Sequence, residues 1–356
     1  MTVDTSVRFG APTEPHPSCA TPLSELAVSH EALRNQFRGL DIIVPDFYGL
    51  MPGWSPKVNE VYTNELRKKT NSWLLDRIAS NSKHRKWIEG VNPLFLSSCF
   101  YPDIEEEPCY QIGLYTGWLY LWDDEIDCGI LAKDTAGTKR VYKETQAVMS
   151  YTLGPTRFSG PPPEMSPIME VYCDVVTTIQ ASCSEPTQVR VLDELRQYAN
   201  AVVSMQAKYN EDLPNFKEFN ESRRHTAGVG IYIGLLEYCY KLDIPSSFFE
   251  HEAVKTIIDK ACSLIQNIND VASLAKEIGD VRGQLDNVVA VLVHHHKLSP
   301  QAAIDFTCQL VSDDHTAFED AKTRVPIPED NPKLAQDIRT WIKGCEDIVI
   351  GMTYWT

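Results

Sequence analysis

The run Asn-Asp-Val-Ala-Ser-Leu-Ala-Lys-Glu at residues 269–277 decides the fold of this chain, together with the run Trp-Asp-Asp-Glu-Ile-Asp at residues 122–127. In the later run, Asn269, Ser273 and Glu277 are spaced four residues apart. On a helix such residues share one face, about 6 Å from each other. Because the two runs are far apart in the sequence, the chain must return across a bundle of helices to bring them together. We therefore predict an all-α fold, a single-domain helical bundle.

The oxygen atoms in these two runs predict a site for a hard divalent cation. Asn269, Ser273 and Glu277 supply amide, hydroxyl and carboxylate oxygens, which favour Mg²⁺ or Mn²⁺ over zinc. Asp123 and Asp127 have the same four-residue spacing. Since Mg²⁺ takes only one or two protein carboxylates and completes its shell with water and phosphate oxygens, two sparse motifs that face each other predict ions shared with a polyphosphate substrate.

Composition bounds the class of protein. The chain has 356 residues, of which 43% are hydrophobic and 23% are charged, as in an ordinary globular protein. The formal charge of −16 argues against nucleic acid or an anionic membrane surface as a partner, because both require a basic face. The same charge would repel a diphosphate unless cations intervene, which agrees with the predicted metal sites.

Local signals divide the chain and predict its surroundings. Residues 1–40 are rich in Pro, Ser, Thr and Gly and are predicted to form a flexible leader, and residues 41–356 one helical domain. The N-terminus does not resemble a signal peptide, and no apolar run reaches 18 residues, so we expect a cytoplasmic protein. The ten cysteines show no CxxC pair, and we expect them to be reduced and mostly buried.

Two segments carry signals for where helices begin and break. Ser299 followed by Pro300 predicts the start of a helix, with a capping hydroxyl before a proline at the first helical position. Three glycines within residues 226–234 predict a helix break or a close contact between helices. The histidines at 294–296 are a weak metal candidate, because consecutive helical residues point in different directions. The run Asp-Asp-His at 313–315 is equally weak.

Together, the two runs resemble the metal motifs of class I terpene synthases of the fungal and bacterial sesquiterpene cyclase type. Residues 123–127 resemble the aspartate-rich motif, and residues 269–277 resemble the second metal motif, including its lysine before the glutamate. Gly279-Asp280, Asn287-Val288 and the run beginning at Arg223, 46 residues before Asn269, agree with the family pattern. Taken alone, each run also fits a solvated helix face. The resemblance implies a class I terpenoid synthase α-helical bundle with a central active-site cavity.

The resemblance also implies roles for individual residues in a reaction that needs three Mg²⁺ ions, with Mn²⁺ as an alternative. By this resemblance, Asp123 would bridge two of the ions. The third ion would be held by Asn269, Ser273 and Glu277. Asp127 and Asp124 would be outer ligands or would bind an ion in only some states of the reaction. Arg223 would bind the substrate diphosphate through its planar guanidinium, and Lys276 would add a point charge.

Aromatic side chains would stabilise a carbocation intermediate without attacking it. Tyr120 lies three residues before Asp123, on the same helical face, and is the first candidate. Trp355 and Phe95 are weaker candidates. Trp118 and Trp122 are predicted to be core residues, because a chain with 10% aromatic residues must bury most of them.

The family pattern also includes an Arg-Tyr pair six residues after the tryptophan that Trp355 resembles. That pair would fall at about 361 and 362, beyond Thr356, so the given sequence either is truncated or belongs to a protein that works without the pair.

The leading functional prediction is a cyclase that converts farnesyl diphosphate to a polycyclic sesquiterpene, as a monomer or homodimer. Geranyl or geranylgeranyl diphosphate is an alternative substrate. A non-catalytic binder of isoprenoid diphosphates is a second reading. A chain-elongating prenyltransferase ranks lower, because it needs a second aspartate-rich motif.

Overall fold

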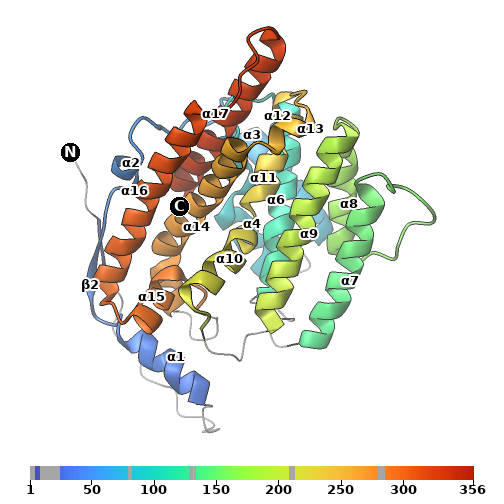
Figure 1. Cartoon of the computed structure of the whole chain (residues 1–356). Coiled ribbons are helices and arrows are strands. Elements are labelled where there is room, and N and C mark those ends of the chain that lie inside the picture. The colour runs from blue at the N-terminus through green and yellow to red at the C-terminus, as the bar shows by residue number, and fades with distance from the viewer. Residues whose placement is uncertain are drawn as a thin grey trace.

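Long helices lie side by side through most of the chain, as the computed structural model in Figure 1 shows. The structure describes residues 5–8, 25–78, 82–127, 131, 134–207, 213–279 and 285–356. The helices are α1 (Glu25–Asn35), α2 (Phe47–Leu50), α3 (Asn64–Ile78), α4 (Ser82–Val91), α5 (Pro93–Phe100), α6 (Glu106–Asp127), α7 (Thr135–Thr152), α8 (Pro167–Gln180), α9 (Glu185–Ala207), α10 (Phe216–Thr226), α11 (Val229–Gly234), α12 (Leu236–Tyr240), α13 (Ser246–Phe249), α14 (Glu252–Gly279), α15 (Val288–His296), α16 (Pro300–Thr323) and α17 (Pro332–Trp355). The prediction of an all-α bundle is confirmed.

The helix α14 carries the second motif and packs along α16 and α17. Apolar residues three or four positions apart, such as Ile257, Ala261, Leu264 and Ile268, are fully buried on one face. Such spacing produces an amphipathic helix that is held by its neighbours rather than by intrinsic propensity. The polar stripe of the motif lies in the C-terminal part of the same helix.

The helix α6 carries the aspartate-rich motif and packs against α5, α8 and α3. Trp118 and Trp122 are almost completely buried, as predicted for core residues. The indole Nε1 of Trp122 donates a hydrogen bond to Thr145 Oγ1 at 3.0 Å, so its polar atom is satisfied inside the core. This packing fixes the rotation of α6 and thereby the face from which Asp123 projects.

Both helix signals read from the sequence are confirmed. Ser299 caps α16, because its Oγ accepts a hydrogen bond from the backbone N–H of Ala302. The glycine-rich segment interrupts the helix between α10 and α11, where Gly228 adopts a φ of 68°. A positive φ is a conformation that glycine adopts without strain. The interruption ends α10 at Thr226 and so places Arg223 in the last turn of that helix.

The structure has regular elements inside the range assigned to the leader. The strand β1 (Thr5–Arg8) pairs antiparallel with β2 (Asp41–Val44). Leu33 in α1 and Phe37 just after it are buried in a core with α15 and α16. Residues before position 41 therefore also pack into the helical core. The domain boundary at residue 41 stays a prediction.

The end of α17 lies very close to α5, and a substitution there tests this packing. A Cβ added to Gly351 would lie 2.4 Å from the carbonyl oxygen of Cys99 in α5. We expect Gly351→Ala to lower the free energy of unfolding by about 1–3 kcal/mol, because backbone atoms cannot move aside as a side chain can. Urea denaturation followed by circular dichroism would measure the change.

Gly90→Ala in α4 is the matched control, because a Cβ there would meet no atom within 4 Å. We expect it to raise the free energy of unfolding by about 0.5–1 kcal/mol through the lower backbone entropy of the unfolded chain. Equal stability of Gly351→Ala and the wild type would contradict the close packing of α17 on α5.

In the part of the chain that the structure covers, the state of the cysteines and the lengths of the apolar helices agree with what the sequence predicts. Eight cysteines there are free, and six of them are buried, while Cys19 and Cys128 lie outside the described residues. Among the described helices, none combines the length and the apolar character that crossing a bilayer requires.

Candidate active site

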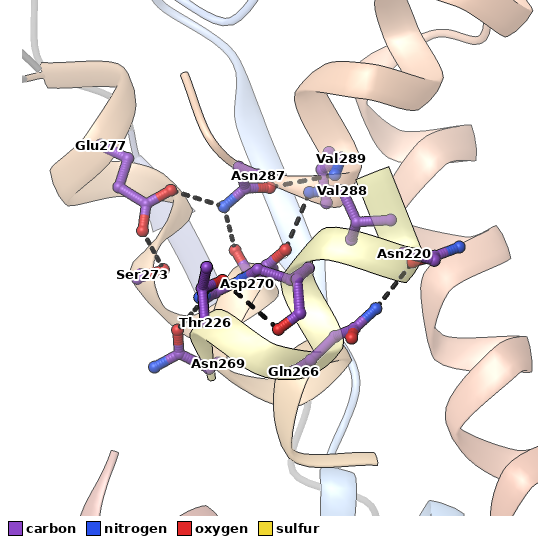
Figure 2. A network of polar contacts seen from close by, with 11 residues as sticks. Asn220, Thr226, Gln266, Asn269, Asp270, Ser273, Glu277, Asn287, Val288 and Val289 are labelled. Atoms are coloured by element: carbon purple, nitrogen blue, oxygen red, sulfur yellow. Dashed lines mark hydrogen bonds and ion pairs between the residues drawn. The ribbon is translucent and has the colours of Figure 1, made fainter. Parts of the chain in front are cut away.

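The second motif forms a polar stripe on α14, as Figure 2 shows. Asn269, Ser273 and Glu277 are half-buried on the face predicted from their spacing. The hydroxyl of Ser273 donates a hydrogen bond to Glu277 Oε1 at 2.6 Å. A hydroxyl and a carboxylate oxygen therefore lie next to each other on this face. Their role as metal ligands stays a prediction.

Arg223 in the last turn of α10 contacts the beginning of this stripe. Its Nη2 donates a hydrogen bond to Asn269 Oδ1 at 2.9 Å, and Nη2 and Nε donate to Asp270 Oδ1 at 2.8 and 3.0 Å. The side chain of Asp270 is completely buried, and that of Arg223 is 14% exposed. Burial raises the pKa of Asp270 to about 7, although Arg223 opposes the rise. The predicted diphosphate-binding arginine is thus anchored to the second motif.

Asp123 lies on α6 and is held by the neighbouring helix α9. The hydroxyl of Tyr198 donates a hydrogen bond to Asp123 Oδ1 at 2.6 Å. Burial raises the pKa of Asp123 to about 6, Tyr198 and Arg223 oppose the rise, and Asp124 adds to it. The backbone of Asp127 belongs to α6, but its side chain lies outside the described residues.

Asp286 connects the two motifs electrostatically and was missed by the sequence reasoning. Burial raises its pKa to about 6, both Glu277 and Asp123 add to the rise, and Arg223 opposes it. Carboxylates that repel one another in this way must be close in space. The adjacent Asn287 donates a hydrogen bond to Glu277, which places Asp286 beside the second motif, and the electrostatic effect of Asp123 indicates that the first motif is near as well. The only sequence signal was the position of Asp286 just downstream of the second motif.

The donor set fits a divalent cation. Asp123, Asn269, Ser273 and Glu277 offer only oxygen atoms, the donors that Mg²⁺ and Mn²⁺ prefer. Burial is the main cause of the raised pKa values of Asp123 and Asp286, neighbouring carboxylates add to the rise, and a bound cation would stabilise the charged form of both groups. Within the residues that the structure covers, no group of three or more His, Cys, Asp and Glu could hold a metal. The candidate site instead combines carboxylates with an amide and a hydroxyl.

An aromatic cluster adjoins the polar site through Tyr120. The ring of Tyr120 lies 6.1 Å from that of Trp87 in α4 and 6.2 Å from that of Trp355 in α17. Trp355 donates its indole N–H to the carbonyl oxygen of Val91 at 3.0 Å, which holds the last turn of α17 against the end of α4. Burial raises the pKa of Tyr120, with Asp123 adding to the rise. Trp87 was missed because it lies on a separate helix.

The remaining predicted residues lie further from this cluster or point elsewhere. The ring of Phe95 contacts Tyr62 and Tyr354, at 5.2 and 6.0 Å. The side chain of Lys276 is exposed on α14. The weak candidate His295 contacts the carbonyl oxygen of Leu213. The role of Lys276 in binding the diphosphate and that of Phe95 in stabilising a carbocation stay predictions.

Comparisons with known proteins agree with this fold and identify the family. The model of terpene synthase family 2, C-terminal metal binding, matches residues 115–315. The chain is 32% identical to terpene cyclase braA of Annulohypoxylon truncatum over 89% of this chain and 85% of that protein. It is 22% identical to silphinene synthase peniA of Penicillium patulum over 92% and 87% of the two chains.

Solved structures show the same fold. The crystal structure of germacradien-4-ol synthase from Streptomyces citricolor is similar with a TM-score of 0.71 and 17% identity, over 86% of this chain and 97% of that chain. That of α-eudesmol synthase gives a TM-score of 0.74 and 18% identity, over 85% and 96%. The helical bundle is therefore the class I terpene synthase fold. The chain belongs to the terpene synthase family, as an enzyme of the sesquiterpene cyclase type and the lyase class.

Proposed function

We propose that the protein is a Mg²⁺-dependent sesquiterpene cyclase that ionises farnesyl diphosphate and cyclises the resulting carbocation to a polycyclic hydrocarbon or alcohol, with release of diphosphate. The observation that carries this proposal is that Arg223 donates hydrogen bonds to Asn269 and Asp270 in the second motif and also interacts electrostatically with Asp123 in the first. Two acidic motifs and one arginine are the groups that binding of a diphosphate and its cations would require. A fifteen-carbon substrate is supported by relatives named as sesquiterpene synthases, for example one from Postia placenta.

The ligands for the metal ions would come from both motifs. Asp123 and Asp127 on α6 and Asn269, Ser273 and Glu277 on α14 would hold three Mg²⁺ ions together with the substrate diphosphate. Bound Mg²⁺ supplies Lewis-acid stabilisation of the negative charge that develops on the leaving diphosphate.

The protein's own cations would orient the leaving group. Arg223 presents a planar guanidinium that suits bidentate bonds to phosphate oxygens, and its anchor on Asp270 limits its freedom. A preorganised donor costs little reorganisation when charge develops. Lys276, exposed on the same helix as the stripe, would add a mobile point charge.

The aromatic cluster would form part of the wall of a central cavity. Tyr120 lies one turn before Asp123, so the prenyl chain next to the diphosphate would meet its ring and those of Trp87 and Trp355. Aromatic faces stabilise a desolvated cation by about 2 kcal/mol or more. They also exclude water, which would otherwise quench the intermediate.

Metal removal tests the proposal directly. We expect purified protein with farnesyl diphosphate and Mg²⁺ to give a cyclic fifteen-carbon product in gas chromatography–mass spectrometry, to lose it with EDTA, and to regain it with excess Mg²⁺. The restoration controls for damage by the chelator. Parallel reactions with geranyl and geranylgeranyl diphosphate test the chain length.

Other outcomes would separate the alternatives. A cyclic product formed equally with EDTA would contradict the metal dependence. Thermal stabilisation by diphosphate and Mg²⁺ without any product would instead favour the non-catalytic binder. A cytoplasmic location, with free cysteines, and a monomeric or dimeric state are part of the proposal.

A further inference from the structure

Asn287 lies between the C-terminal part of α14 and the start of α15, in the upper part of the network in Figure 2. Its side chain is completely buried. Its amide nitrogen Nδ2 donates to Glu277 Oε2 at 2.8 Å and to the carbonyl oxygen of Asp270 at 2.6 Å. Its Oδ1 accepts from the backbone N–H of Val289 at 3.0 Å, which caps α15.

The cap determines which way the amide faces. Because Oδ1 must accept from the N–H of Val289, the two N–H donors of Asn287 are directed toward α14. The neighbouring N–H of Val288 donates to Asp270 Oδ2 at 2.9 Å and ties the same junction a second time. A rotated amide would lose the cap and leave buried donors and acceptors unsatisfied.

The orientation of Asn287 in turn fixes the carboxylate of Glu277. Asn287 holds Oε2, while Ser273 donates to Oε1. The carboxylate of Glu277 is therefore held at both oxygens. Its Oε1 lies beside the hydroxyl of Ser273, which is predicted to bind the same metal ion. Without Asn287, only the bond from Ser273 would hold the carboxylate of Glu277, and its Oε2 could turn toward water on the half-exposed face of α14.

We propose that Asn287 is a positioning residue that holds Glu277 in the orientation needed to bind a divalent cation, and that it does not contact the cation itself. This inference rests on the proposed function. It assigns a role to a residue outside both metal motifs, and helix capping alone does not account for its contacts. A cap requires only Oδ1, and Ser or Thr would serve equally well, whereas the bond to Glu277 requires the amide donors.

This difference defines the test. Asn287→Ser keeps a neutral capping oxygen and removes the amide that reaches Glu277. Binding of Mn²⁺ in the presence of inorganic diphosphate would be measured by electron paramagnetic resonance, at a temperature where circular dichroism shows both proteins folded. We expect Asn287→Ser to bind Mn²⁺ about 10–100-fold more weakly than the wild type, as for other residues that orient metal ligands.

Asn331→Ser is the matched control. Asn331 caps α17 through the same kind of bond, to the N–H of Leu334 at 3.1 Å, on a helix that carries none of the predicted ligands. We expect its Mn²⁺ affinity to equal that of the wild type. A metal-free crystal structure of Asn287→Ser should show the Glu277 carboxylate turned away from Ser273.

The outcomes separate this inference from the proposed function. Equal Mn²⁺ affinity of Asn287→Ser and the wild type, or an unmoved Glu277, would overturn the inference and leave the proposed function standing. A wild-type protein that binds no Mn²⁺ with diphosphate would contradict the proposed function itself, and with it the inference. If Asn287→Ser does not fold, Asn287→Thr, which is larger and also caps, takes its place with the same expected loss.

Discussion

Arg223→Ala is expected to lower the free energy of unfolding by about 3–5 kcal/mol, the range found when one partner of a buried ion pair is removed. Asp270 is completely buried and accepts two hydrogen bonds from Arg223. Without the guanidinium, both hydrogen bonds are lost. The buried carboxyl group of Asp270 must then either stay charged without a counterion or take up a proton, and both alternatives cost free energy. Urea denaturation would measure the loss.

Two variants make this result specific. Arg224→Ala changes the adjacent arginine, whose ion pair with Asp259 is 39% and 42% exposed, and we expect a loss of no more than about 1 kcal/mol. Asp270→Asn added to Arg223→Ala removes the unpaired carboxylate, so we expect it to restore part of the stability without restoring product formation. If Arg223→Ala and Arg224→Ala were equally mild, Arg223 would not form the buried anchor described here.

Asp123→Asn is expected to reduce turnover about a thousandfold, equivalent to about 4 kcal/mol of transition-state stabilisation, while stability changes little. The proposed role of Asp123 as a metal ligand requires its negative charge, which the amide lacks. Folding does not require that charge, because burial raises the pKa of Asp123, which means that the folded state favours the neutral carboxyl more than the unfolded chain does. The hydroxyl of Tyr198 can still donate to the amide oxygen at the position of Oδ1.

The measurement pairs single-turnover release of diphosphate with urea denaturation of the same preparation. Asp193→Asn is the control, since its carboxylate is 60% exposed on α9 and forms a long ion pair with Arg196. We expect it to leave both quantities unchanged. Turnover by Asp123→Asn within tenfold of the wild type would remove Asp123 from the set of metal ligands.

The parts of the site that lie on one helix were predictable from the sequence. The four-residue spacing of Asn269, Ser273 and Glu277 determines that they share a face, whatever packs around α14. The burial of Trp118 and Trp122 followed from composition. Both predictions depend on properties of the sequence itself, helical spacing in the first case and aromatic content in the second, and not on which helices pack together.

The parts that depend on contacts between elements were not predictable. Tyr198 and Trp87 reach the site from α9 and α4, and nothing in their local sequence distinguishes them from other Tyr and Trp residues. Asp286, in the segment before α15, had only its position downstream of the second motif as a signal. The packing of Leu33 and Phe37 was missed for the same reason. Their burial depends on surfaces provided by α15 and α16, which the local composition of residues 1–40 does not reveal.

The close approach of α17 to α5 at Gly351 has a consequence for how product specificity can change. Trp355 lies four residues later, on the same face of α17, and is held at the carbonyl group of Val91 just before α5. The distance between these two helices therefore sets how far the indole ring extends toward Tyr120. If Tyr120 and Trp355 contact the prenyl chain as proposed, a single methyl group at position 351 would change the shape of their binding surface without touching the substrate. Variants with altered products should accordingly be sought between these helices as well as among the aromatic residues themselves.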